Sequence, residues 1–357
     1  MRKKNSNLFF FFLLIILLIF VFLVLLYFEN RPVDNGQTNE SQNLLILGQV
    51  GDFPDTLLYF CPEDACKEEI VSLILDSNKT IDCAIYDITS REVADALISE
   101  NQEGTKIRIV TDKGRSQTKS TLVSDLKVSG INVLISPTEN SYMHNKFCVF
   151  DDNISMIASA NFTENSFSKS YNNILVFKSP RLSKVLKEKI DSFYLGNFSK
   201  SSNILGKTFD ENFSIFFCPN NNCKFQIISN IASAKQSIAC MMYSFTLDDF
   251  GDEMVKAKER GVDVKIILET QQKSQYSEFE KFKAMGVFVI DDNDPYLMHN
   301  KYCVFDNMVV TTGSMNFSNN GTNNNDETLV IIKHQKLAED YLENFQRHWS
   351  AWNNQVN

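Results

Sequence analysis

The sequence predicts an α/β fold, made of two tandem copies of one domain that follow a single membrane anchor. Three observations support this prediction. An uninterrupted apolar run, residues 8–28, lies near the N-terminus. After it, one set of spaced residues occurs twice. Within each copy, short β-branched and aromatic runs alternate with helical patterns, as in sheets that are covered by helices.

The anchor is predicted from the length of the apolar run. As a helix it would be about 31 Å long, enough to cross the hydrocarbon core of a bilayer. A cleaved signal peptide is the alternative, but it would have a shorter apolar core followed by small residues. The basic residues in 1–7 make this segment a cytoplasmic tail. We therefore expect a single-pass protein with an extracytoplasmic body, joined through a polar linker at residues 29–55.

Composition places the rest of the chain among globular proteins. The whole sequence is 43% hydrophobic and 22% charged, and its formal net charge is −9. An acidic body argues against non-specific binding of nucleic acid through an overall positive field. It does not exclude a local basic cleft.

The duplication is defined by recurring residues. Two of the four histidines occupy the same place in YMHNKFCVFD and LMHNKYCVFD. We assign residues 56–200 to the first copy and 201–357 to the second. Offsets of 157 and then 155 residues relate Cys61/Cys218, Cys66/Cys223, Cys83/Cys240, Tyr86/Tyr243, Gly104/Gly261, His144/His299, Lys146/Lys301, Cys148/Cys303 and Ser159/Ser314.

The alternating pattern predicts a mostly parallel or mixed sheet in each copy. In the first copy, strands are expected at Leu57–Phe60, Thr80–Ile88, Lys106–Thr111, Ile131–Ile135, Lys146–Asp151, Ser155–Ala160 and Ile174–Phe177. Helices are expected there at Ala65–Asp76, Arg91–Glu100, Ser116–Val128 and Arg181–Phe193. In the second copy, strands are expected at Phe213–Phe217, Ser237–Tyr243, Val264–Glu269, Val287–Ile290, Lys301–Asp306, Met308–Thr312 and Thr328–Ile332, before a last helix at Lys336–Trp349. Residues 196–210 connect the copies.

Each copy carries a histidine and a lysine two residues apart on a predicted strand, so both side chains point to one face. This pairing suits the binding and attack of an anionic phosphoryl group. The pairs are His144/Lys146 and His299/Lys301. An aspartate follows each pair at an odd spacing and would point to the other face if the strand runs that far unbroken, so Asp151 and Asp306 are predicted to be structural.

A second polar cluster follows each pair after a short apolar strand. It contains Ser159 and Asn161 in the first copy, and Ser314 and Asn316 in the second. We expect these hydroxyls and amides to donate to phosphate oxygens. The alternative is a turn rich in serine and asparagine.

Taken together, the residues read His-x-Lys-x4-Asp and then Gly/Ala-Ser-x-Asn, twice. This pattern resembles the signature of the phospholipase D superfamily, over about residues 55–350. The resemblance implies that the two motifs meet at a pseudo-twofold axis and form one active site in a single chain. One histidine would attack phosphorus to form a phosphohistidine, and the other would serve as acid and base. The lysines and asparagines would hold the non-bridging oxygens, with no metal and no other cofactor.

The two copies differ in the residue expected to hold each histidine. Glu327 lies 28 residues after His299, where family members commonly use an acid to hold the catalytic imidazole. In the first copy we expect Asn173 to orient His144, although an amide stabilises an imidazolium less. Because the family usually assigns the nucleophile to the first motif, this difference leaves open which histidine attacks.

A metal site is the alternative interpretation of the histidines. The helical His-x3-His spacing of zinc sites is absent, and a lysine beside each histidine would repel a cation. We therefore predict no metal.

The cysteines fall into two groups. Those within apolar strands, Cys83, Cys148, Cys240 and Cys303, are predicted to be buried small hydrophobes. Those that flank short loops, Cys61/Cys66 and Cys218/Cys223, are predicted to form disulfides if the body is extracytoplasmic. Free thiols and a four-cysteine zinc site are the alternatives for these loops.

The function expected from the sequence is a membrane-anchored phosphodiesterase that acts on phospholipid head groups, because the anchor holds the site near a bilayer. A nuclease of DNA or RNA with the same chemistry is the first alternative, since each copy is as compact as the nuclease members of the family. A phosphatidyltransferase of the cardiolipin synthase type is the second. A degenerate binding module is disfavoured, because both His-Lys pairs are intact. The loops at 112–120 and 269–278 would form the pocket walls that decide the substrate.

Overall fold

The computed structural model describes residues 54–137, 141–201 and 206–353. The expected tail and anchor, residues 1–28, and nearly all of the expected linker lie outside these ranges. Within the described ranges, no helix combines the length and the hydrophobicity that crossing a membrane requires.

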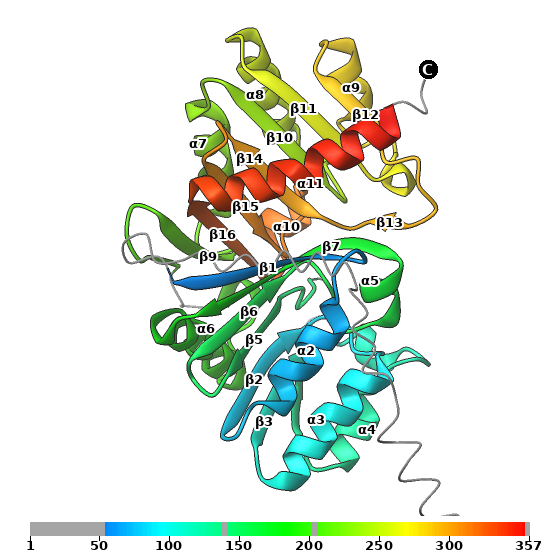
Figure 1. Ribbon diagram of the computed structural model, residues 1–357, viewed down its shortest axis with the longest axis vertical. Helices are drawn as coiled ribbons and strands as arrows, with labels where there is room; N and C mark the ends of the chain where they lie inside the picture. Colours follow the sequence, from blue (N-terminus) through cyan, green and yellow to red (C-terminus); the bar gives the residue numbers. More distant parts are fainter. Residues whose placement is uncertain (1–53, 138–140, 202–205, 354–357) are drawn as a thin grey trace, which may run out of the picture. The chain divides into compact units, whose positions relative to one another are not determined.

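The first half is a mixed sheet in the order β1-β7-β6-β5-β2-β3-β4 (Figure 1). Strands β2, β3 and β4 pair in parallel, and the other neighbours on this path are antiparallel. The strands are β1 (Asp55–Cys61), β2 (Thr80–Ile85), β3 (Lys106–Thr111), β4 (Asn132–Ile135), β5 (Lys146–Phe150), β6 (Ile154–Ala158) and β7 (Ser170–Lys178). The helices are α2 (Cys66–Leu75), α3 (Arg91–Glu103), α4 (Val123–Val128), α5 (Glu164–Ser168) and α6 (Pro180–Tyr194).

The second half repeats this arrangement in the order β12-β11-β10-β14-β15-β16-β9-β8. Its strands are β8 (Lys207–Thr208), β9 (Phe213–Cys218), β10 (Ser237–Met242), β11 (Asp263–Leu268), β12 (Phe288–Asp291), β14 (Lys301–Phe305), β15 (Val309–Gly313) and β16 (Glu327–Lys333). Its helices are α7 (Cys223–Ser233), α8 (Asp248–Glu259), α9 (Phe279–Ala284), α10 (Asn319–Asn323) and α11 (Gln335–Asn353). One further strand, β13 (Leu297–Met298), pairs with β7 of the first half. The predicted mixed sheet in each copy is confirmed.

Each sheet is buried on both faces, and the two faces belong to different cores. In β5, Phe147 and Val149 enter a core that both halves share, while Cys148 and Phe150 enter a core of the first half alone. This alternation follows from the two-residue period of a strand. Helices α6 and α11 contribute to the shared core, and α11 lies across β10, β14 and β15 (Figure 1). The shared core therefore joins the two motif strands to one hydrophobic interior.

The helix predicted at Ser116–Val128 is wrong in its first half. Residues Arg115–Gln117 form a single 3-10 turn, and the α-helix begins only at Val123. The cause is local, because short hydroxyl side chains bond the nearby backbone instead of continuing a helix. The Ser116 hydroxyl donates to the Lys113 carbonyl, and the Thr118 hydroxyl donates to the Arg115 carbonyl.

All eight cysteines are paired. The predicted disulfides Cys61–Cys66 and Cys218–Cys223 are confirmed. The prediction of unpaired hydrophobes at the other four positions is wrong, since these form Cys83–Cys148 and Cys240–Cys303. Each of these two bonds joins residues directly opposite on antiparallel strands, β2 with β5 and β10 with β14, with 4.1 Å between Cα atoms. The strands were predicted, but their pairing was not.

Candidate active site

The histidines precede the motif strands, and each is held by backbone of the other half. The His144 N–H donates to the Asp326 carbonyl at 2.9 Å, and the His299 N–H donates to the Tyr171 carbonyl at 2.9 Å. Both histidine residues are buried, with 8% and 9% of their surface exposed. Each histidine is therefore held by backbone at a strand of the other half, beside β16 for His144 and in β7 for His299.

The carboxylate of Glu327 holds His144 and does not hold His299. His144 Nδ1 lies 2.9 and 2.8 Å from the two carboxylate oxygens. Glu327 is fully buried, and it also accepts from the Ser314 hydroxyl at 2.5 Å and the Asn325 amide at 3.2 Å. The prediction that Glu327 supports His299 is wrong, because the two halves exchange these partners.

His299 is held by Asn172. Its Nδ1 lies 3.0 Å from Asn172 Oδ1, and the Ser159 hydroxyl donates to the same oxygen at 2.9 Å. The Asn172 amide nitrogen donates to the carbonyls of Ser166 and Ser170, which fixes the oxygen toward His299. His299 Nδ1 must therefore carry a proton, and its Nε2 is left for chemistry.

Asn173, the predicted partner of His144, has a different role. Its Nδ2 donates to Asn300 Oδ1 at 2.8 Å, and its Oδ1 accepts from the hydroxyls of Thr312 and Tyr341. Asn172 lies 28 residues after His144, the same spacing as Glu327 after His299. This spacing was the signal that could have identified Asn172 from the sequence.

The asparagine between His and Lys in each motif accepts a side-chain hydrogen bond from the other half. Asn145 Oδ1 accepts from the Thr328 hydroxyl at 2.6 Å, and Asn300 Oδ1 accepts from Asn173 at 2.8 Å. Thr328 and Asn173 each follow directly after the residue that holds a histidine. The two hydrogen bonds are therefore pseudo-symmetric. Each one fixes the residue next to a histidine partner, Glu327 or Asn172, in the opposite half.

The lysines converge on the same space. Lys146 Nζ donates to the His144 carbonyl and Lys301 Nζ to the His299 carbonyl, both at 2.7 Å. Burial lowers the pKa of Lys146 to about 7, and burial together with Lys146 lowers the pKa of Lys301. An anionic ligand would oppose both shifts, since it favours the charged ammonium groups.

The buried site disfavours the charged form of both imidazoles. Burial, with the lysines of both halves, lowers the pKa of His144 and of His299 well below the ordinary value. Burial also raises the pKa of Glu327 to about 8. His144 Nδ1 and the Glu327 carboxylate form one hydrogen-bonded pair, in which the carboxylate favours a proton on Nδ1 and leaves Nε2 without one.

The second polar cluster divides its roles between serine and asparagine. Ser159 and Ser314 are fully buried and donate to Asn172 and Glu327, so the prediction that they donate to phosphate is wrong. Asn161 and Asn316 are half-buried, and within the described ranges the Oδ1 of each has no hydrogen-bond partner. These two carboxamides are suited to contact a ligand, whereas the serines position the histidine partners.

Residues 70–194 and 227–349 match the family described as cardiolipin synthase, PLD-like domain. The chain belongs to the phospholipase D superfamily. Phospholipase D of Rickettsia prowazekii is 30% identical over 155 residues, which are 43% of this chain and 76% of that protein. Human mitochondrial cardiolipin hydrolase is 26% identical over 129 residues, which are 36% of this chain and 51% of that protein, about half its length. Phosphatidylserine synthase of Haemophilus influenzae shares the fold, with a TM-score of 0.66 and 14% identity over 82% of this chain and 85% of that one.

Asp151 and Asp306 support the phospholipase D motifs without entering the site. Asp151 accepts from the N–H groups of residues 78–80, and Asp306 accepts from those of residues 235–237. Burial alone would raise the pKa of each carboxyl, but these backbone hydrogen bonds lower it. The predicted structural role is confirmed, since each aspartate ties the end of a motif strand to the turn before β2 or β10.

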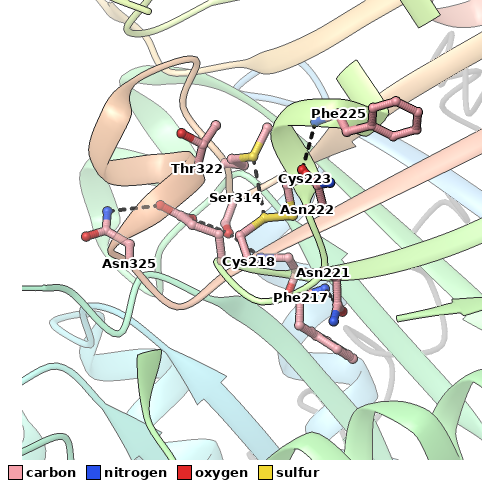
Figure 2. The surroundings of a disulfide bond; sticks show 12 residues. Phe217, Cys218, Asn221, Asn222, Cys223, Phe225, Ser314, Thr322 and Asn325 are labelled. Atoms are coloured by element: carbon pink, nitrogen blue, oxygen red, sulfur yellow. Dashed lines mark hydrogen bonds between the residues drawn. A yellow bond between two sulfur atoms is a disulfide. The ribbon is translucent and has the colours of Figure 1, made fainter. Parts of the chain in front are cut away.

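The disulfide loops lie beside the residues that hold the histidines. Cys61 is opposite Asn172 in the sheet, and Cys218 is opposite Glu327. Figure 2 shows the second loop with its Cys218–Cys223 bond, and Cys218 Sγ lies 3.5 Å from the sulfur of Met315, the residue after Ser314. The loops therefore brace the strands that position the histidines.

Sequence reasoning gave no site role to two tyrosines and two acids. The rings of Tyr86 and Tyr243 pack edge-on against His144 and His299, with centroids 4.8 and 4.7 Å apart. Asp112 and Glu269 accept from the backbone N–H groups of Met143 and Met298, at 3.1 and 2.7 Å. The recurrence of Tyr86 as Tyr243 was visible in the sequence.

The described ranges contain no group of three or more His, Cys, Asp or Glu arranged to hold a metal ion.

Proposed function

We propose that this protein hydrolyses a phosphodiester bond of phospholipid head groups through a phosphohistidine at His144. The observation that carries the proposal is the unequal support of two convergent histidines. His144 has a buried carboxylate on Nδ1, whereas His299 has a neutral amide. One chain supplies both, so we propose that a single chain is active.

In the first step, His144 Nε2 attacks phosphorus, and the bond to the leaving oxygen breaks. Attack places positive charge on the imidazole, and Glu327 stabilises that charge as the acid of a catalytic triad does. His299 donates its Nε2 proton to the leaving oxygen. Asn172 orients this ring but offers no counter-charge, so His299 gives up its proton more readily than His144 would.

In the second step, His299 removes a proton from water, and the resulting hydroxide attacks the phosphohistidine. The P–N bond breaks, the phosphomonoester leaves and His144 is restored. Lys146, Lys301, Asn161 and Asn316 hold the non-bridging oxygens through both steps. The bound phosphate raises the depressed pKa values of the lysines and of His299, so that the acid is charged when it is needed.

A lipid substrate is supported by three features. The relatives reported above are named for phospholipid chemistry, the apolar run at residues 8–28 suits a bilayer, and the net charge of −9 disfavours polyanions. Transfer to an alcohol is the second candidate, because the matching family is described as cardiolipin synthase. The alcohol would replace water at His299.

The test is an assay of the full chain in detergent micelles that contain labelled phospholipid. We expect released head group and phosphatidate, at an unchanged rate in the presence of a chelator. With added glycerol, a phosphatidylglycerol product would reassign the reaction to transfer. Cleavage of single- or double-stranded nucleic acid without turnover of any phospholipid would reject the proposed substrate.

We also propose that residues 8–28 are a single membrane span, with the N-terminus in the cytoplasm and the body outside it. The four disulfides support this orientation, because disulfides persist in oxidising compartments. We expect an alkaline phosphatase fused to the C-terminus to be active, since that enzyme needs its own disulfides. An inactive fusion, with thiols that alkylate before reduction, would place the body in the cytoplasm.

A further inference from the structure

Besides Glu327 and Asn172, the two sides of the site differ at another pair of equivalent residues, Arg115 and Gln272. Each lies in a single 3-10 turn after a parallel strand, Arg115–Gln117 after β3 and Thr270–Gln272 after β11. Each contacts the tyrosine that packs on a catalytic histidine. Gln272 Nε2 donates to the Tyr243 hydroxyl at 2.9 Å, and the Arg115 guanidinium carbon lies 5.1 Å from the centre of the Tyr86 ring.

The backbone of Arg115 is tied to the first motif. Its N–H donates to Asp112 Oδ1 at 3.2 Å, and Asp112 Oδ2 accepts from the N–H of Met143, next to His144. The position of the arginine is therefore set by the same carboxylate that positions the motif backbone.

The charge of the Arg115 guanidinium acts on titratable groups of both halves. Burial is the main cause of the lowered pKa of His144, and Arg115 adds to it. In the other half, burial and Glu269 raise the pKa of Tyr243, and Arg115 opposes that rise. The Arg115 side chain is 45% exposed, and Asp87, a carboxylate of the same half, lies 4.0 Å from it. Its charge thus reaches both halves, while nearly half of the side chain remains open to solvent.

A single phosphodiester does not require this arginine. It carries one negative charge, and two lysines and two carboxamides already converge on it. A planar guanidinium binds a phosphate through two parallel hydrogen bonds, which makes it the side chain suited to a separate anion. Across the site, Gln272 is neutral, and Lys273 beside it is paired with Asp291. A second anion is therefore favoured on the Tyr86 side only.

We propose that Arg115 determines specificity by binding a second phosphate of the substrate, next to the diester that is cleaved. Lipids with a second phosphate are preferred over lipids with neutral or zwitterionic head groups. This inference rests on the proposed function, since it assigns the substrate class of the same site.

The experiment compares phosphatidylglycerol with phosphatidylglycerol phosphate, which differ only in a terminal phosphate. Both are presented to the full chain in neutral detergent micelles. We expect Arg115→Gln to lower kcat/KM for the phosphorylated lipid by about 10- to 100-fold, the loss of a charge-assisted hydrogen-bond pair. The value for phosphatidylglycerol should change less than about threefold. Arg115→Lys should keep part of the preference. Lys119→Gln, which removes an equal charge from the same loop, should keep all of it.

An equal loss on both lipids would overturn the inference, because Arg115 would then act on the cleaved diester itself. If Lys119→Gln lowered the preference for the phosphorylated lipid as much as Arg115→Gln does, the preference would depend on the overall charge of the loop and the inference would be overturned. If neither lipid is hydrolysed, the proposed function fails, and a chromogenic pair tests Arg115 separately. That pair is thymidine 5′-(4-nitrophenyl phosphate) with and without a 3′-phosphate. A preference for the 3′-phosphate that Arg115→Gln abolishes supports the recognition of a second phosphate, and no preference rejects it.

Discussion

His144→Ala is expected to lower kcat by a factor on the order of 10⁴ or more, with no covalent intermediate, because the variant lacks the attacking atom. His299→Ala should also stop turnover, but at a different step. With a 4-nitrophenyl diester the leaving group departs without a proton, so His299→Ala should still be phosphorylated. We expect one equivalent of nitrophenolate per chain from His299→Ala, followed by arrest, and none from His144→Ala.

The measurement is rapid-quench kinetics with a ³²P-labelled diester, followed by peptide mapping. The label should survive alkali, as a phosphohistidine does, and should map to the peptide that contains residue 144. His334→Ala, at the residue directly before α11 and outside the site, is the matched control and should keep full turnover. A burst from His144→Ala, or label on the peptide that contains residue 299, would reverse the two roles.

Much of the fold could be predicted because it depends on local periodicity. The strand predicted at Lys146–Asp151 is β5, Lys146–Phe150, and the strand predicted at Lys301–Asp306 is β14, Lys301–Phe305. The shared face of His and Lys follows from the same period. The 3-10 turn at Arg115 could not be predicted by periodicity, since it depends on hydroxyl groups that bond their own backbone.

The assignment of partners failed for a different reason. Sequence spacing measures distance along one copy, and it gives no information about exchange between copies. Glu327 was therefore given to the histidine of its own copy, although backbone pairing with Asp326 brings His144 to it. The strand disulfides were missed in the same way, since Cys83 and Cys148 meet only through the antiparallel pairing of β2 and β5. Both errors concern contacts between strands, which a one-dimensional pattern leaves open.

The exchange of partners supplies the second large prediction. Glu327→Gln keeps the volume and one carbonyl oxygen for the Nδ1 proton, so it gives His144 the kind of support that Asn172 gives His299. Only the charge is removed. We expect phosphorylation of His144 to slow by about 10²- to 10⁴-fold, as when the acid of a triad is neutralised. Because the imidazolium loses its counter-charge, the acidic limb of the burst-rate profile should move to lower pH.

Asn172→Ala is the matched variant on the other side. It removes one neutral hydrogen bond from His299, and we expect a loss of about 10-fold in turnover of a lipid. The burst with the 4-nitrophenyl diester should stay nearly unchanged, because that reaction needs no acid.

Asn172→Asp separates charge from position at His299. A carboxylate there would strengthen the hold of His299 on its proton and make it a weaker acid. Lipid turnover should fall, while the burst with the 4-nitrophenyl diester persists. Equal losses in the burst from Glu327→Gln and Asn172→Ala would mean that the carboxylate only orients its ring. A slowed hydrolysis of the phosphohistidine in Glu327→Gln, with a normal burst, would mean that the charge serves water attack and not the nucleophile.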